Sequence, residues 1–392
     1  MKKVLIAYPN MAIGGSTTSL LGLLSVMDEK IYDVDLLLYQ NEGTLLNEIP
    51  QYVNVLQPAR KSCSRMVDRF FRFSHPSYIL KRLYGKYKAK TGKYKLLESQ
   101  LMAYDEAKYS RKVKKHYDIA ISFLEGWPSV YIAKYITADK KIAWVHVDYE
   151  NAGLNPKYDS EIYSKFDDIV TVSEICKNNM IKSFPQLADK IMWIGNISNV
   201  LSIKKKARED VGFEVEESTI NFMSACRISM RHKGLDRMLW FLRDNKKCGG
   251  PKIKWYIAGN GHDKKEFCDL ILKYDLKNDV ILLGEQENPF PYLVKMDAFV
   301  LLSRYEGKPM AVTEALVLGI PVIVAEYASA KEQIENNVNG FILNNSDQTI
   351  SSQMQKIVRE NDFKDLRKKM QMNNFSFDKE KEQIYKLLRE KK

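Results

Sequence analysis

Two glutamates in the C-terminal half are placed to hold hydroxyl groups. Glu306 follows an apolar run at residues 298–302, and Glu314 lies in the apolar stretch that begins after Pro309. Proline suits the first position of a helix, so we expect Glu314 just over one turn inside a helix. Its apolar neighbours do not fit a solvated surface position. A carboxylate there can accept both hydrogens of a ribose diol, and one on the loop can accept from pyranose hydroxyls.

A basic loop follows another apolar run, at residues 220–224. It carries Arg227 and Lys233 and leads into a helix expected from about Leu235. A planar guanidinium and an ammonium together can clamp a diphosphate. The alternative is an ordinary basic surface loop, of which the neighbouring Arg231 is an example. After the next strand, the turn at Gly259 permits the close approach of a nucleotide.

Two further candidates lie in the N-terminal half. Gly14 and Gly15 follow the first apolar run and precede a helix that we expect Ser16 or Thr17 to cap. Helix amides beside small residues can bind a phosphate, although a plain glycine turn has the same sequence pattern. His146 directly follows the run at 141–145 and can contact a substrate hydroxyl, or can be an ordinary core or surface histidine.

All of these residues follow short apolar runs that alternate with helical stretches. The runs are residues 3–8, 34–39, 118–124, 141–145, 168–172 and 191–194, then 220–224, 254–258, 280–283, 298–302 and 321–324. This alternation predicts an α/β fold with two Rossmann-like domains, each a parallel sheet wrapped by helices. We place the hinge in the lysine-rich turn at 195–206. Ligands of such sheets bind beyond the carboxyl ends of the strands, where the candidate residues lie.

In this order the motifs resemble the retaining glycosyltransferases of family four, the glycosyl transferases group 1, of the bacterial surface-polysaccharide type. Glu306 and Glu314 form the family's E-x7-E pattern, and the likeness covers most of the chain. It implies a GT-B fold, with two Rossmann-like domains whose parallel sheets face each other across a cleft. Residues 1–196 would bind the acceptor, 197–372 the nucleotide-sugar, and 373–392 would return as a helix to the N-terminal domain.

The resemblance also assigns roles to residues. It implies catalytic roles for His146 on the transferred sugar, for Glu306 on its hydroxyls, and for Arg227 and Lys233 on the donor diphosphate. The implied donor-binding residues are Gly14, Gly15, Gly259, Lys308, Met310, Ala311 and Glu314, with Glu314 on the ribose. Lys308 stands where many members carry an apolar or aromatic residue, and the hinge at 194–197 lacks the usual proline. These departures bear on which sugar is bound.

The expected reaction moves a hexose or N-acetylhexosamine, with retention, from a nucleotide-sugar to a glycan hydroxyl. UDP is the first choice of nucleotide and GDP the second, and the acceptor is expected to be linked to polyprenyl diphosphate. We expect no cofactor and no obligatory metal, because Asp33 and Asp35 lie within a strand rather than in a metal-binding loop. Two alternatives share the fold: a sugar-nucleotide epimerase, which needs no acceptor, and a non-catalytic partner, which would have lost clamp residues.

Nearly the whole net charge of +12 lies in residues 60–95. This segment has twelve basic residues, Asp68 as its acidic residue, and seven aromatic rings. The combination predicts docking on an anionic membrane surface, with Arg69, Arg72, Lys81, Arg82, Lys86 and Lys88 contacting the membrane or the acceptor. A solvated face, or a site for acidic polysaccharide or nucleic acid, is the alternative; we expect no nucleic-acid partner.

Composition bounds the class of protein. A chain of 392 residues with 45% hydrophobic content can fill two cores, and it has no apolar run near the length of a membrane span. Met1 leads directly into the first strand without a signal-peptide pattern, so we expect a cytoplasmic protein that is peripheral on the inner face of the plasma membrane. The five scattered cysteines indicate neither disulfides nor a zinc site, and we expect them to be packing residues.

Overall fold

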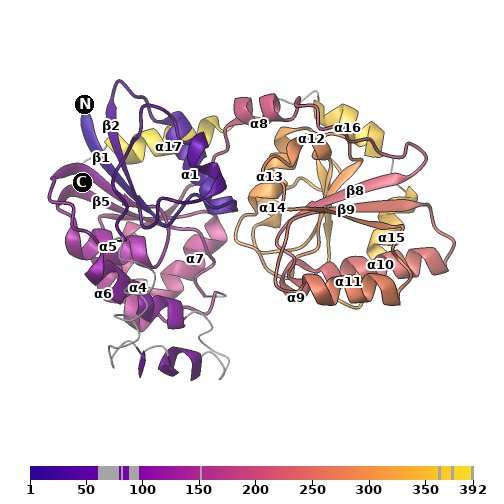
Figure 1. The fold of residues 1–392 in the computed structure, drawn as a ribbon, viewed down its shortest axis with the longest axis horizontal. Helices are drawn as coiled ribbons and strands as arrows, with labels where there is room; N and C mark the ends of the chain where they lie inside the picture. Colours follow the sequence, from indigo (N-terminus) through magenta and orange to yellow (C-terminus); the bar gives the residue numbers. More distant parts are fainter. Residues whose placement is uncertain are drawn as a thin grey trace. The chain divides into compact units, whose positions relative to one another are not determined.

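The computed structural model describes residues 1–60, 79–80, 83–87, 97–150, 152–360, 363–371 and 375–389. The chain divides into two compact units (Figure 1). Unit 1 comprises Met1–Ile197 together with the returning segment Asp378–Lys392, and unit 2 comprises Ser198–Phe377. Each is described by itself below.

Unit 1 has a seven-stranded sheet among its described residues, in the order β3-β2-β1-β4-β5-β6-β7, and every pairing is parallel. Its strands are β1 (Lys2–Tyr8), β2 (Tyr32–Leu38), β3 (Asn54–Val55), β4 (Tyr117–Ser122), β5 (Ala138–Val145), β6 (Asp168–Thr171) and β7 (Ile191–Trp193). Its helices are α1 (Gly15–Val26), η1 (Thr44–Glu48), α4 (Leu97–Tyr109), α5 (Trp127–Tyr135), α6 (Pro156–Ser164), α7 (Glu174–Ser183), η2 (Pro185–Lys190) and α17 (Asp378–Arg389).

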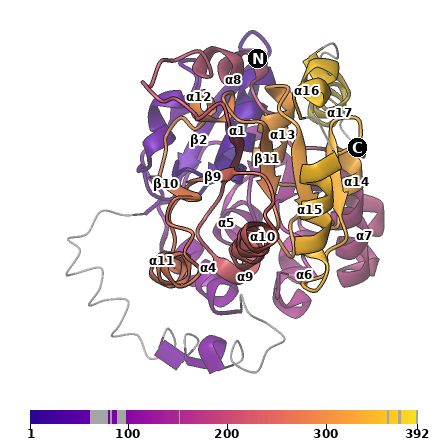
Figure 2. The same ribbon diagram turned by 90° about the vertical axis from the view of Figure 1, so that its right-hand side faces the viewer.

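Unit 2 has a six-stranded parallel sheet in the order β10-β9-β8-β11-β12-β13 among its described residues. Its strands are β8 (Ile220–Ala225), β9 (Ile253–Ala258), β10 (Val280–Gly284), β11 (Ala298–Leu301), β12 (Val322–Ala325) and β13 (Gly340–Leu343). Its helices are α8 (Val200–Lys206), α9 (Met230–Lys233), α10 (Leu235–Lys247), α11 (Lys264–Lys273), α12 (Phe290–Leu293), α13 (Met310–Val317), α14 (Ala330–Gln333), α15 (Ile350–Glu360) and α16 (Phe363–Gln371). Helix α10 packs against α15 (Figure 2).

The C-terminal boundary differs from the predicted one. Unit 2 continues to Phe377 rather than ending at residue 372. The reason is apolar packing, because Phe375 packs against the core of unit 2 and its ring lies 5.1 Å from that of Phe377. At the other boundary, part of the expected lysine-rich turn is helix α8, which Asn199 caps by accepting from the amide of Ser202.

Helix α17 belongs to unit 1, where the resemblance places the end of the chain. It lies beside α1 (Figure 1), and the hydroxyl of Tyr385 donates to the carbonyl of Val26 (2.9 Å). Lys2 Nζ donates to the carbonyl of Leu388 (3.0 Å), and Lys140 Nζ donates to that of Leu387 (2.8 Å). These lysines satisfy helix C-terminal carbonyls that have no partner within the helix.

Two smaller findings concern the surface. In the part of the chain that the structure describes, no helix combines the length and apolarity needed to cross a membrane. None of the four described cysteines forms a disulfide: Cys176 is buried, Cys226 and Cys268 are half-buried, and Cys248 is exposed. Cys248 is therefore not a packing residue, contrary to the prediction, because it ends α10 at the surface. Cys63 lies outside the described residues.

Candidate functional site

The candidate residues of unit 2 flank the place where its strand order reverses. From the centre of the sheet, β8 leads toward β9 and β10, whereas β11 leads toward β12 and β13. Arg227 and α9 follow β8, and Glu306 follows β11. Ligands of open α/β sheets bind at this switch point, because the two connections leave in opposite directions and expose the strand ends.

Lys233 and Glu306 meet at this edge of the sheet. Lys233 Nζ lies 2.6 Å from Glu306 Oε1, and the side chains are 18% and 10% exposed. The pair is thus partly desolvated, which strengthens its charge-assisted hydrogen bond. Arg227, in contrast, is exposed. Burial lowers the pKa of His232, and the charges of Lys233 and Arg227 lower it further, so positive charge gathers on this loop.

Glycine is required at two positions of the basic loop and its neighbour. Gly234, directly after Lys233, has φ +67°, and a Cβ there would lie 2.0 Å from the carbonyl oxygen of Leu302. Gly259 has φ +148°, and its Cβ would lie 2.0 Å from the carbonyl oxygen of Cys226. Only glycine permits these contacts between backbones, so both loops are fixed closely against neighbouring strand ends.

The N-terminus of α13 is braced by residues that the motifs did not indicate. Pro309 occupies the cap position rather than the predicted first helical position, and no side chain caps the helix. Ser329 Oγ donates to the carbonyl of Gly307, and Gln333 Nε2 donates to the Thr313 hydroxyl (2.9 Å). In the sequence, Ser329 and Gln333 are marked only by their position after β12, the strand next to β11 in the sheet.

The remaining donor-site candidates lie on this same segment. Lys308 and Ala311 are half-buried, and the Met310 side chain is buried in the core of its unit, which leaves its backbone amide at the helix start. Glu314 is half-buried on α13. Burial raises the pKa of Glu314 to about 7, against the opposing charge of Lys206. Its carboxyl is therefore poised to ionise when a hydrogen-bond donor approaches.

In unit 1, Gly14 and Gly15 lie at the N-terminus of α1. Gly15 is the first residue of the helix, Gly14 precedes it, and a Cβ on Gly14 would have no atom within 4 Å. The predicted cap is wrong. The Ser16 and Thr17 hydroxyls bond instead to the hydroxyl of Tyr8 (2.7 and 3.1 Å). The amides of the first turn thus have no side-chain cap.

His146 lies at the carboxyl end of β5, with its ring 4.7 Å from that of Phe123. Its Nε2 is buried without a hydrogen-bond partner. Burial lowers the pKa of His146 to about 3, so the imidazole is neutral near pH 7. Its backbone amide donates to Glu125 Oε2 (3.1 Å), and burial raises the pKa of this carboxyl. Sequence reasoning missed Glu125, whose signal is its position just after β4.

Asp33 and Asp35 lie within strand β2, as predicted, and both contact Lys115 (3.9 and 2.8 Å). Among the described residues, no three or more His, Cys, Asp or Glu side chains are grouped to hold a metal ion. Of the predicted membrane residues, Lys86 is described and exposed. Arg69, Arg72, Lys81, Arg82 and Lys88 lie outside the described residues.

Comparison with known proteins places this geometry in context. Residues 203–377 match the model of the family described as glycosyl transferases group 1. The uncharacterized glycosyltransferase MJ1059 of Methanocaldococcus jannaschii is 30% identical over 216 residues, 52% of each chain. The O-antigen biosynthesis glycosyltransferase WclY of Escherichia coli is 27% identical over 164 residues, 42% of this chain and 44% of its own.

A further relative, from Campylobacter jejuni, is an N-acetylgalactosamine-N,N'-diacetylbacillosaminyl-diphospho-undecaprenol 4-alpha-N-acetylgalactosaminyltransferase. It is 25% identical over 184 residues, 47% of this chain and 48% of its own. The chain thus spans about half the length of the curated relatives it matches. Anabaena HepE, solved in complex with UDP and glucose, aligns with a TM-score of 0.69 at 15% identity over 99% of both chains. The likeness shows that the fold is GT-B.

Proposed function

Because residues 203–377 match the model of the glycosyl transferases group 1 family, we propose that this protein is a retaining, metal-independent glycosyltransferase. It moves a hexose or an N-acetylhexosamine from a nucleotide-sugar, in the first instance a UDP-sugar, to a glycan hydroxyl. The acceptor is linked to polyprenyl diphosphate, and the product serves surface-polysaccharide biosynthesis. The relatives named for O-antigen biosynthesis and for an undecaprenol-linked substrate support this choice, as does the UDP bound by HepE.

The observation that carries the proposal is the arrangement at the switch point of unit 2. A cation clamp after β8 and a carboxylate after β11 meet as Lys233 and Glu306, 2.6 Å apart. The uncapped start of α13 lies on the same connection, with Glu314 one turn further along. Cations suit a diphosphate, helix amides suit anions or sugar oxygens, and carboxylates suit hydroxyls. A nucleotide-sugar has all three kinds of group.

The reaction balances without a protein nucleophile. The bond between the anomeric carbon and the donor phosphate oxygen breaks, and a bond from that carbon to the acceptor oxygen forms on the same face. The acceptor proton passes to the leaving phosphate oxygen. Arg227 and Lys233 stabilise the charge that develops on the diphosphate. Neutral His146 contacts the transferred sugar through Nε2, which has no protein partner.

A transfer assay tests the proposal. The protein is incubated with single UDP- or GDP-sugars, with and without a polyprenyl-diphosphate-linked glycan, and nucleoside diphosphate release is measured. We expect release that depends on the acceptor and a product whose anomeric configuration, determined by NMR, matches that of the donor. An altered sugar nucleotide formed without acceptor would indicate an epimerase instead. The absence of both binding and turnover for every donor would indicate a non-catalytic partner.

Membrane docking through residues 60–95 is a second part of the proposal. Within its described part, Leu80, Leu83 and Tyr87 are 66%, 60% and 64% exposed beside the exposed Lys86. Replacing Lys81, Arg82, Lys86 and Lys88 by Gln should weaken binding to anionic vesicles by up to about 4 kcal/mol, at about 1 kcal/mol per charge. Co-sedimentation at low salt measures this loss. Unchanged partitioning would end the membrane hypothesis, and lost donor binding would assign the segment to the donor site.

A further inference from the structure

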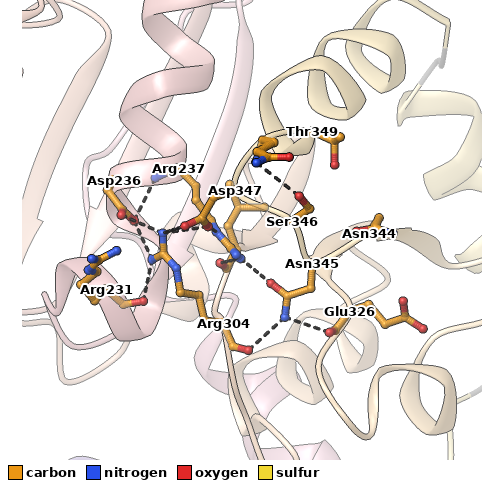
Figure 3. Close-up of polar contacts among 12 residues, drawn as sticks. Arg231, Asp236, Arg237, Arg304, Glu326, Asn344, Asn345, Ser346, Asp347 and Thr349 are labelled. Atoms are coloured by element: carbon orange, nitrogen blue, oxygen red, sulfur yellow. Dashed lines mark hydrogen bonds and ion pairs between the residues drawn. The ribbon is translucent and has the colours of Figure 1, made fainter.

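A partly buried set of charges lies next to the loops that carry Lys233 and Glu306. It joins Asp236 and Arg237 of α10, Arg304 after β11, and Asn345 and Asp347 after β13 (Figure 3). The Arg304 guanidinium donates to both oxygens of Asp236 (2.9 and 2.8 Å) and to both oxygens of Asp347 (2.9 Å each). Arg237 donates to Asp347 (2.7 Å) and to the amide oxygen of Asn345 (2.6 Å).

Partial burial sets the contacts of Asp236 and Arg237 apart from surface ion pairs. The Arg304 and Asp236 side chains are 18% and 12% exposed and Arg237 is 2% exposed, whereas Asp347 is 40% exposed. Burial alone would raise the pKa of Asp347, but hydrogen bonds from Arg304 and Arg237 hold it below its usual value. Two arginines and two aspartates thus balance in charge. A partly desolvated, bidentate pair of this kind fixes geometry far better than an exposed one.

Arg304 also connects the two loops of the candidate site. Its guanidinium donates to the carbonyl of Arg231 (2.7 Å), and its backbone amide donates to that of His232 (3.0 Å). Lys233 directly follows His232 in the basic loop. Glu306 lies two residues after Arg304 in the loop that follows β11. The same guanidinium therefore holds both segments at the positions from which the Lys233–Glu306 pair forms.

A stacked ring pair reinforces the same connection. The His232 and Tyr305 rings lie 4.2 Å apart at an interplanar angle of 8°, and His232 Nε2 lies 3.2 Å from the carbonyl oxygen of Tyr305. Tyr305 itself is 52% exposed, so stacking adds little apolar burial. Its position depends on the backbone that Arg304 fixes. Hydrogen bonds, ion pairs and one stacked ring pair thus connect the two loops, with little apolar packing between them.

We propose that Arg304 is a positioning residue, which acts through Asp236 and Asp347 to hold Lys233 and Glu306 in register for the donor diphosphate and sugar. The part that concerns the donor rests on the proposed function; the part that concerns register does not. Lysine cannot take its place, because an ammonium lacks the planar fork that serves two carboxylates and a carbonyl at once. Arg304→Lys therefore keeps the charge and removes the geometry.

The test compares Arg304→Lys with Arg243→Lys, since Arg243 also pairs with an aspartate, Asp244, at 2.8 Å. The first readout needs no substrate: the acetylation rate of Lys233, followed by mass spectrometry. We expect Arg304→Lys to raise this rate several-fold and Arg243→Lys to leave it at the wild-type value. Thermal unfolding of both variants checks that the fold persists. If Arg304→Lys does not fold, Asp347→Asn is used, which removes one carboxylate and keeps the pair with Asp236.

The second readout is a double-mutant cycle on kcat/KM. Arg304→Lys should lower kcat/KM about tenfold or more in the wild-type background, and less than about threefold in a Lys233→Ala background, since contacting residues are not additive. Equal losses in both backgrounds, or an unchanged Lys233 acetylation rate, would overturn the inference. A wild-type protein without transfer for any donor would count against the proposed function, while the acetylation rates would still decide the positioning role.

Discussion

Glu314 is the residue whose charge depends on pH near neutrality. Its pKa of about 7 results from burial, so the carboxyl is mostly protonated below this pH. Because the folded-state pKa is raised, the group stabilises the fold fully below its unfolded pKa of about 4.5, and this contribution is lost as pH rises through about 7. A ligand hydroxyl that donates a hydrogen bond to the ionised carboxylate would favour the ionised form over the protonated one.

This gives the first prediction. If the carboxylate of Glu314 accepts from the ribose diol, nucleoside affinity should rise about tenfold between pH 6 and pH 8, in proportion to the ionised fraction. Calorimetry with uridine measures it, since a nucleoside lacks the phosphate that titrates near pH 6. Glu314→Gln should show a weak affinity independent of pH. A wild-type affinity that stays flat over this range would remove Glu314 from the nucleoside site.

The second prediction concerns the clamp. Arg227→Ala and Lys233→Ala should each lower kcat/KM by roughly 2 to 4 kcal/mol, the magnitude for losing a donor that stabilises developing charge. Lys233→Ala should also leave Glu306 without the cation 2.6 Å away. Steady-state kinetics measure both, with Arg231→Ala as the control, because the structure uses the carbonyl of Arg231 and its side chain is exposed. Wild-type turnover in both clamp variants would refute the assignment.

The sequence predicts some of these site residues and not others. Glu306, Lys233 and Gly234 belong to spaced motifs, so their convergence follows from the order of strands. The bracing contacts of Ser329, and the pairing of Arg304 with Asp236 and Asp347, join segments distant in the chain. They depend on side-chain directions that only packing fixes. Glu125 was missed because no spaced partner accompanies it in the sequence.

At the scale of elements, the sheets of both units follow from alternation of apolar runs and helices. The eleven predicted runs all coincide with strands. In the part of the chain that the structure describes, the two strands that were not predicted are β3, which has two residues, and β13, which has four and begins with Gly340 after a polar stretch. β3 is too short for a periodic signal, and β13 begins with a glycine that follows a polar stretch, a pattern that predicts a turn. Helix α8 escaped because its lysines dominate the composition, whereas Asn199 caps it.

Gly234 supplies the third prediction, at the joint between α9 and α10. Gly234→Ala should destabilise the protein by about 1 to 3 kcal/mol or more, from strain at φ +67° and from the contact with Leu302. Gly249→Ala is the matched control, since Gly249 has φ +61° but open space around its Cβ, and should cost only about 1 kcal/mol. Urea unfolding separates the two. Equal losses would mean that the approach to Leu302 adds no strain.

At the scale of the whole molecule, unit 1 includes helix α17, which follows the residues of unit 2 in the sequence. Lys140 attaches α17 to the sheet of unit 1, because its Nζ lies 2.8 Å from Asp168 and also donates to the carbonyl of Leu387 in α17. The Lys140 and Asp168 side chains are 8% and 2% exposed. A buried pair of this kind costs free energy to desolvate, so its effect shows mainly when one partner is removed.

The fourth prediction follows from this pair. Lys140→Met should destabilise the protein by about 3 to 5 kcal/mol, because Asp168 is left buried without its cation. Lys157→Met, at an exposed lysine of the same unit, should change stability by less than about 0.5 kcal/mol. Urea unfolding measures both, and proteolysis mapped by mass spectrometry should cut α17 first in the Lys140 variant. Equal stability of the two variants would contradict the role given to Lys140.

The return of α17 also orders events during biosynthesis. The 180 residues of unit 2, Ser198–Phe377, leave the ribosome before α17 does. At about 5 to 20 residues per second, the nascent unit 1 waits on the order of ten to forty seconds for the helix that covers part of its surface. During that interval the groups that later bury Ile384, Leu387 and Leu388 face solvent or a chaperone. The N-terminal unit is thus translated first and completed last.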